Sequence, residues 1–223
     1  MKLAFFCNNY PMDSKLGGIG LRILEIAQVL SKNFEITIVT PYPSDFNLHP
    51  MRLISQDETQ TSSILEWCDA AFFTDMPDYK LLLLAHNLNK IIICDNAVPI
   101  EQIGYNEIQT SPFPDLSYKL LVKIFELQVL VSDIFLTRAN VERSTLLSAL
   151  VLSGRFNYSN FTRSSTLEHM IFDIPIGFNL LSEEHKKNIS PNKFKVDYIW
   201  NGGVWDFYDA CTVIKAIASK SKT

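Results

Sequence analysis

The segment Leu16-Gly-Gly-Ile-Gly-Leu-Arg-Ile-Leu-Glu-Ile-Ala-Gln-Val-Leu-Ser31 lies between two short apolar runs, Leu3–Cys7 and Ile36–Val39. Its apolar residues recur at helical spacing, which predicts a helix with one face packed on a sheet. The order of strand, glycine-rich loop, helix and strand is typical of the first βαβ unit of an open parallel sheet. The sequence therefore predicts an α/β protein with a Rossmann-like parallel sheet. The residues predicted to face that sheet are Ile23, Ile26, Ala27 and Leu30.

Three glycines, Gly17, Gly18 and Gly20, open this helix. Because they carry no side chains, an anion such as a phosphate can approach the backbone N–H groups and the positive end of the helix. In an open parallel sheet this loop lies at the carboxyl edge, where ligands bind. A second interpretation stays open, since glycines at this place also simply form a tight strand-to-helix turn.

The composition is that of an ordinary soluble globular protein, because 47% of the 223 residues are hydrophobic and 20% are charged. This length predicts one well-packed domain and part of another. A net charge of -4 argues against a nucleic-acid-binding protein. Met1 and Lys2 lead directly into a strand, so no signal peptide is expected, and no apolar run approaches the ~20 residues of a transmembrane segment. We therefore expect a cytoplasmic location.

The four cysteines and four histidines are scattered through the sequence. No cysteines have C-x-x-C spacing, and no histidines have the spacing of a zinc site. The sequence predicts neither a disulfide framework nor a metal centre.

Further strands are predicted at 51–54, 70–75, 90–96, 134–137 and 170–176. Helices are predicted at 61–68, 77–86, 115–132 and 138–152, and the stretch 154–165, which has no clear period, is interpreted as a loop. Asp95 and Asn96 come where a buried parallel strand ends, which makes them candidates for ligand contacts.

The long helix predicted at 115–132 carries a continuous apolar face. Its members are Leu116, Leu120, Leu121, Ile124, Leu127 and Val131. Lys119 and Lys123 lie off that face, which allows two interpretations: a helix that lies on a membrane surface, or a helix packed on the core with one solvated side. We favour the core-packed helix, because only two cations contribute.

The composition changes after about residue 180. Residues 181–193 are polar and are interpreted as a linker. Beyond them, a strand at 195–200, a second glycine turn at Gly202 and Gly203, and a helix to about residue 218 repeat the opening pattern, with Asp206 or Asp209 as the helix cap. We therefore expect a first domain at 1–180 and, at 194–223, the first strand–helix unit of a truncated second domain.

One alternative function is a nicotinamide- or flavin-dependent oxidoreductase with the same type of fold. A dinucleotide site needs G-x-G-x-x-G directly after the first strand and an acidic residue at the end of the second strand. Here the segment 8–16 separates the first strand from the glycines, and the second strand ends at Thr40 and Pro41. Both conditions fail.

Three distant stretches together indicate a family. Gly17–Arg22, with Glu25–Leu30 and Glu35–Pro41, resembles the opening of family 4 glycosyltransferases of the two-domain GT-B type. Ser132–Arg138 is similar to the last stretch before the interdomain crossover in one bacterial branch of that family. Trp200–Asp209 looks like the start of the second domain in the same branch.

This resemblance implies transfer of a sugar from a nucleotide-diphosphate sugar to a glycan or lipid-linked acceptor, with no cofactor and no obligatory metal. The first glycine loop would approach the diphosphate from the acceptor domain, with the second glycine turn across the cleft. For Arg22 and Arg138, contact with a phosphate or acceptor and a solvated charge are both open. The implied substrate-binding residues are Gly17, Gly18, Gly20, Arg22, Asp95, Asn96, Arg138, Gly202 and Gly203.

The sequence also departs from the family pattern. The family's contacts to the donor base and ribose, and its E-x7-E acidic pair, belong to the second domain, but the chain ends at Thr223 before such a motif. We therefore expect a truncated or split enzyme that depends on a separate donor-domain chain. Peripheral contact at the inner face of the membrane stays open. The alternative is a non-catalytic acceptor-binding or regulatory partner of a glycosyltransferase. Exposed apolar residues on the last helix, Val213, Ile214 and Ile217, would favour that alternative.

Overall fold

The computed structural model describes residues 1–7, 10–13, 16–44, 46–55, 58–95, 108, 110–176 and 209–220. The chain divides into two compact units, Met1–Gly177 and Phe178–Thr223, and each is described by itself.

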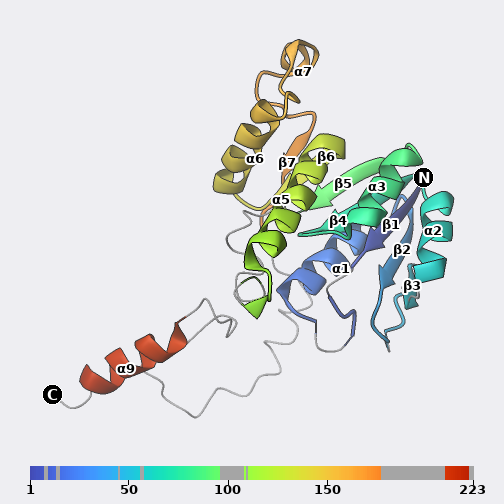
Figure 1. The fold of residues 1–223 in the computed structure, drawn as a ribbon. Coiled ribbons are helices and arrows are strands. Elements are labelled where there is room, and N and C mark those ends of the chain that lie inside the picture. The colour runs from blue at the N-terminus through green and yellow to red at the C-terminus, as the bar shows by residue number, and fades with distance from the viewer. Residues whose placement is uncertain are drawn as a thin grey trace. The chain divides into compact units, whose positions relative to one another are not determined.

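The first unit is built on a seven-stranded sheet in which every pair of neighbouring strands is parallel (Figure 1). The strands are β1 (Lys2–Phe6), β2 (Glu35–Thr40), β3 (Arg52–Ser55), β4 (Ala70–Thr74), β5 (Ile91–Asp95), β6 (Ile134–Thr137) and β7 (Ile171–Asp173). Their order in the sheet is β3-β2-β1-β4-β5-β6-β7. This arrangement confirms the predicted α/β class with a Rossmann-like parallel sheet.

Helices cover the two faces of the sheet unequally. Apolar residues of α1 (Gly18–Leu30) pack with one set of strand residues, which includes Leu3, Phe5 and Ile38. The opposite face, with Ala4, Phe6 and Val39, packs with residues of the other large helices. These are α2 (Glu58–Trp67), α3 (Tyr79–Asn87), α5 (Pro114–Val131) and α6 (Asn140–Leu152).

Two phenylalanine pairs join the central strands. Phe5 of β1 stacks on Phe72 of β4 with ring centroids 4.3 Å apart, and Phe6 stacks on Phe73 at 5.2 Å. The pairs lie on opposite faces of the sheet, because successive side chains of a strand point in opposite directions. All four rings are almost completely buried, so the centre of the core lies where β1 meets β4.

Three sequence predictions about helices are wrong in detail. On α5, Leu116 and Leu120 are 56% and 57% exposed, because only the carboxyl-terminal half of this helix buries residues against the domain. The helix predicted to begin at Pro77 begins at Tyr79, where the Asp78 side chain accepts a hydrogen bond from the Leu81 N–H and caps it. The predicted loop at 154–165 contains a short helix, α7 (Tyr158–Arg163), whose first turn is capped by Asn157.

The described part of the second unit is α9 (Ala210–Lys220). The Asp209 carboxylate accepts a hydrogen bond of 3.0 Å from the Thr212 N–H. Of the two caps predicted for this helix, the structure therefore confirms Asp209. Val213 and Ile214 are 43% and 65% exposed. The predicted linker at 181–193, the strand at 195–200, Asp206, Gly202 and Gly203 lie outside the described residues. Among the helices that the structure describes, none combines the length and apolar character needed to cross a membrane.

Candidate functional site

The candidate site lies at the carboxyl edge of the sheet, where β1 and β4 are neighbours. From these two strands the chain proceeds in opposite directions through the sheet, to β2 and β3 on one side and to β5, β6 and β7 on the other. Ligands of open parallel sheets bind outside the carboxyl ends of the strands at such a reversal. Helix α1 follows β1, so its amino terminus, with the three glycines, belongs to this edge.

The three glycines differ in what surrounds them. A β-carbon on Gly20, which is buried, would lie 2.7 Å from Leu16 Cδ2 and 3.6 Å from the Pro11 carbonyl oxygen, so a side chain at this position would require the end of the Leu16 side chain to move. No atom lies within 4 Å of a β-carbon built on Gly17 or Gly18. Gly17 has φ -75° and ψ 172°, which any residue adopts. Neither packing nor backbone conformation therefore requires glycine at position 17, and the space beside Gly18 is open too.

Arg22, one turn into α1, reaches the end of β5. Its Nε donates a hydrogen bond to Asp95 Oδ2 and its Nη2 donates to Asp95 Oδ1, both at 2.8 Å. The Arg22 side chain is 11% exposed and that of Asp95 is fully buried. Burial raises the pKa of Asp95, and the two hydrogen bonds from Arg22 act against that rise. The structure thus brings together two residues that the sequence proposed as separate ligand contacts.

A second polar pair spans the junction of β1 and β4. The Tyr10 hydroxyl, in the loop after β1, donates a hydrogen bond to Asp75 Oδ2, directly after β4. The Tyr10 carbonyl accepts a hydrogen bond of 3.2 Å from the Thr40 hydroxyl at the end of β2. Tyr10 therefore links the ends of three strands. Burial and the Asp75 carboxylate both raise the pKa of Tyr10, so its hydroxyl stays a hydrogen-bond donor.

Asp75 itself has an unusual backbone. Its φ is 53°, in the left-handed region that few residues other than glycine adopt. Its N–H donates to the Asp95 carbonyl at 3.0 Å, and its carbonyl accepts a bond of 2.7 Å from Nε2 of the buried Gln128 on α5. Such conformations persist where surrounding contacts hold them, and they are frequent at functional sites.

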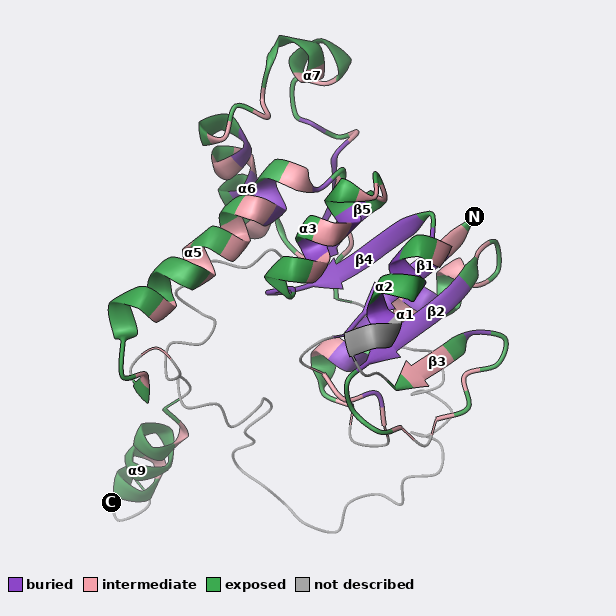
Figure 2. Ribbon diagram, turned by 45° about the vertical axis from the view of Figure 1, so that its right-hand side comes forward, coloured by how far each residue is buried: buried purple, intermediate pink, exposed green. Residues whose placement is uncertain are grey.

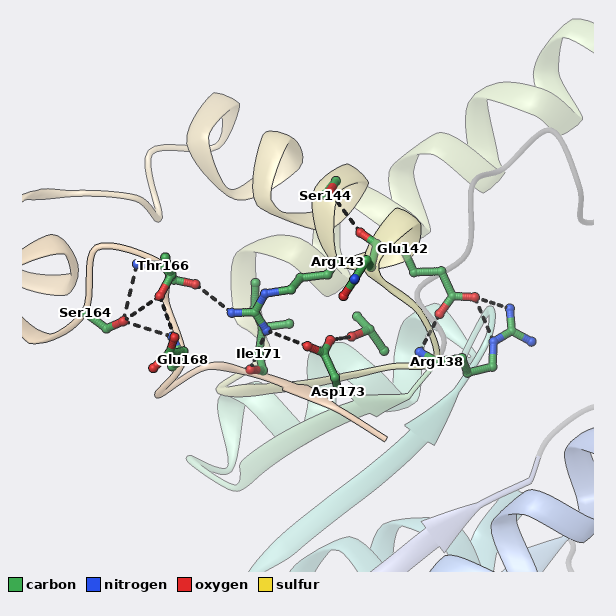
Figure 3. Close-up of polar contacts among 11 residues, drawn as sticks. Arg138, Glu142, Arg143, Ser144, Ser164, Thr166, Glu168, Ile171 and Asp173 are labelled. Carbon is green, nitrogen blue, oxygen red and sulfur yellow. Dashed lines mark hydrogen bonds and ion pairs between the residues drawn. The ribbon is translucent and has the colours of Figure 1, made fainter. Parts of the chain in front are cut away.

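The third pair lies after β6. Arg138 donates through its backbone N–H to Glu142 Oε2 at 2.7 Å and through Nε to Glu142 Oε1 at 2.8 Å (Figure 3). The charges of this pair also act on Asp95, because Arg138 lowers the pKa of Asp95 and Glu142 raises it. The guanidinium groups of Arg22 and Arg138 are therefore both already engaged by carboxylates.

A neighbouring network around Arg143 has a structural role. Arg143 Nη1 donates to the Ile171 carbonyl at 3.0 Å, and Nη2 donates to the Thr166 carbonyl at 2.8 Å (Figure 3). Asp173 accepts hydrogen bonds from Thr137 at 2.5 Å and from Arg143 Nη1 at 3.5 Å. These bonds tie β7, an edge strand of the described sheet, to α6 and β6.

Of the residues proposed from sequence, Gly17, Gly18, Gly20, Arg22, Asp95 and Arg138 all lie at this edge. Asn96, Gly202 and Gly203 lie outside the described residues. Tyr10, Asp75 and Glu142 were not predicted from the sequence. Asp75 follows a buried strand, as Asp95 does, so its place in the sequence is a signal that could have identified it.

The chemistry available here is that of carboxylates, guanidinium groups and backbone amides. Within the described residues, no three His, Cys, Asp or Glu side chains are grouped so that they could hold a metal ion. The Thr74 hydroxyl is buried beside this cluster and has no hydrogen-bond partner among the described residues.

Cys7, Cys68 and Cys94 are buried, and burial raises the pKa of Cys94 to about 11, so these thiols are poor nucleophiles.

Neither a scan against protein-family models nor a search of curated proteins gives a match to this chain. The assignment to glycosyltransferases therefore stays a prediction from the sequence motifs.

Proposed function

We propose that the first unit is the acceptor domain of a glycosyltransferase that uses a nucleotide-diphosphate sugar and a glycan or lipid-linked acceptor. The observation that carries this proposal is the open space at Gly17 and Gly18. Side chains would fit there without disturbing the fold, so the glycines are best explained by a ligand that approaches the helix end.

A diphosphate suits the amino terminus of α1. The first N–H groups of a helix have no partners within it, and Gly17, the N-cap, offers no side-chain hydrogen bond to them. When the bond between the sugar and the diphosphate breaks, negative charge develops on the leaving phosphate, and amides directed at that charge stabilise it. In this proposal, Arg22 positions the helix through Asp95, and it does not contribute a free positive charge.

The binding step can be tested with the full chain. Thermal stability would be measured with UDP, GDP, ADP and inorganic diphosphate, and we expect at least one nucleoside diphosphate to raise the melting temperature. Gly18→Val should abolish this protection while the unliganded protein keeps its fold. Ala210→Val, which also places a valine at the first residue of a helix, is the control and should keep the protection. Undiminished protection of Gly18→Val would remove the glycine loop from the site.

A non-catalytic role as an acceptor-binding or regulatory partner is the second candidate. It is supported by the exposure of Val213 and Ile214 on α9, since exposed apolar residues on one helix often mark an interaction surface. Reconstitution with a separately produced donor domain distinguishes the two candidates. Sugar transfer by the mixture that requires Gly18 supports the enzyme, whereas association without any dependence on Gly18 supports the regulatory partner.

A further inference from the structure

The edge strand β7 borders a hollow on the surface of the first unit. The central strand β4 is buried along its whole length (Figure 2), whereas Phe172 and Asp173 of β7 are both exposed. These two residues line a hollow of about 480 Å³, a volume within the range of small-molecule sites. Helix α6 and the turn before β7 form the rest of its wall, with Asn140, Arg143, Thr166 and Glu168.

The turn before β7 is held in one conformation by its own contacts. Leu167 is fully buried and has φ 55°, a left-handed conformation that is unusual for a bulky side chain. The Ser164 hydroxyl accepts hydrogen bonds from the N–H groups of Thr166 and Glu168, at 3.3 Å and 3.2 Å (Figure 3). The Thr166 hydroxyl in turn donates to Glu168 Oε1 at 3.0 Å. These contacts fix the positions of Thr166 and Glu168 at the hollow.

Polar groups at the hollow retain hydrogen-bonding capacity. Arg143 donates three hydrogen bonds to described residues, whereas a guanidinium group has five N–H groups. The carboxylate of Asp173 accepts two hydrogen bonds, has about four acceptor positions and is 43% exposed. The side-chain amide of Asn140 adds both a donor and an acceptor. Because the charges of Arg143 and Asp173 already meet each other, the hollow offers hydrogen bonds more than free charge.

We propose that this hollow binds one sugar ring of a glycan chain, with the ring of Phe172 against one face of the sugar. A sugar ring has apolar C–H groups on its faces and hydroxyl groups around its rim. The exposed Phe172 ring offers an apolar surface, and Arg143 and Asp173 offer the donors and acceptors that rim hydroxyls need. In the sheet, β4, β5 and β6 lie between β1 and β7, so this site is separate from the glycine loop. The proposal does not depend on the proposed function.

Other occupants fit the hollow less well. Its charged lining consists of one guanidinium group and two carboxylates, those of Glu168 and Asp173, so an anion such as phosphate would meet net negative charge. An added β-strand needs free main-chain groups at the edge of β7. The N–H of Ile171 instead donates to the Leu167 carbonyl at 2.9 Å, and the Ile171 carbonyl accepts a bond of 3.0 Å from Arg143. A neutral ligand rich in hydroxyl groups meets neither obstacle.

Saturation-transfer NMR with the full chain tests the proposal. The probes are the methyl glycosides of glucose, galactose, mannose and N-acetylglucosamine, and we expect at least one of them to receive saturation from the protein. Phe172→Ala should weaken the binding of that glycoside about tenfold, whereas Phe172→Tyr, which keeps the aromatic ring, should bind it as before. Tyr158→Ala removes another exposed ring, on α7, where Tyr158 is 84% exposed. This matched control should bind as the unchanged protein does.

The outcomes separate this proposal from the proposed function, because the probes contain neither a nucleotide nor a phosphate. Absence of saturation transfer to all four glycosides would overturn the sugar site, and so would equal binding by Phe172→Ala and the unchanged protein. Displacement of a bound glycoside by inorganic phosphate would assign the hollow to an anion instead.

Discussion

The guanidinium group of Arg22 and the carboxylate of Asp95 meet in a bidentate pair, with both hydrogen bonds 2.8 Å long, across the space between α1 and the end of β5. The pair connects the helix that begins with the glycines to a strand two places away from β1 in the sheet. Any ligand that moves the amino terminus of α1 therefore also acts on a fully buried carboxylate.

Removing one partner of this pair should be costly. Arg22→Gln leaves the Asp95 charge buried without its counter-ion, so we expect a loss of about 3 kcal/mol in the free energy of unfolding, measured by urea denaturation. Arg52→Gln is the control, because the Arg52–Glu35 pair is 53% and 56% exposed and should cost about 1 kcal/mol or less. Equal losses in the two variants would contradict the structural role of Arg22.

The same variant should respond to pH. Burial raises the pKa of Asp95, and loss of the Arg22 hydrogen bonds raises it further. A carboxyl group whose pKa is raised in the folded state destabilises that state at pH values above its unfolded pKa, and this penalty shrinks as the pH falls from the folded pKa towards the unfolded one. The stability difference between Arg22→Gln and the unchanged protein should therefore narrow in acid. Adding Asp95→Asn to Arg22→Gln removes the buried charge, so the stability difference from the unchanged protein should become smaller at neutral pH.

Gly18→Ala separates stability from binding. The β-carbon meets open space, and alanine favours the helix over glycine, so the free energy of unfolding should rise by about 0.5 kcal/mol. If a ligand phosphate lies against Gly18, the same substitution should weaken protection by nucleoside diphosphates. If Gly18→Ala is more stable and nucleoside diphosphates protect it as before, then neither folding nor ligand binding requires glycine at position 18.

The four cysteines should divide into one reactive thiol and three protected ones. Cys211 is exposed, whereas Cys7, Cys68 and Cys94 are buried. We expect one thiol per chain to react rapidly with a thiol reagent at pH 8 in the folded protein, and the remaining three to react only after unfolding. Cys211→Ser should abolish the rapid reaction. Fast reaction of two or more thiols would contradict the burial of the other three.

The buried thiols also predict a loss of stability in alkali. Burial raises the pKa of Cys7 to about 12 and that of Cys68 to about 11, from an ordinary value of 9.0. Between the ordinary pKa of 9.0 and these raised values, the thiols of the unfolded chain lose protons that the folded protein retains. The free energy of unfolding must therefore fall as the pH rises. Urea denaturation midpoints from pH 8 to pH 11 measure this fall. Cys7→Ala should make the fall less steep.

The sheet was predictable because its signals are local. Each buried strand is a short apolar run, such as Ala70–Thr74, and the helix after the first strand has both glycines at its start and a regular apolar face. The short helix α7 was not predicted, because its six residues contain too little apolar periodicity and only the Asn157 cap marks its start.

The contacts of the site were less accessible to sequence reasoning. The sequence identifies Arg22 and Asp95 as candidates, but it does not indicate that they bind each other, since the pairing depends on how α1 crosses the sheet. The exposure of Leu116 and Leu120 could not be predicted for a similar reason. The sequence pattern of an apolar helical face is the same whether the domain covers the whole length of the helix or half of it.

The two phenylalanine stacks on opposite faces of β1 and β4 have a consequence for hydrogen exchange. Amides in these strands cannot open unless both stacks separate, so they should exchange only through unfolding of the whole domain. In β7, two of three residues are exposed, and its amides should exchange by local opening. The frame beneath the glycine loop thus belongs to the slowest-exchanging part of the protein, and a ligand would meet a support that is already rigid before it arrives.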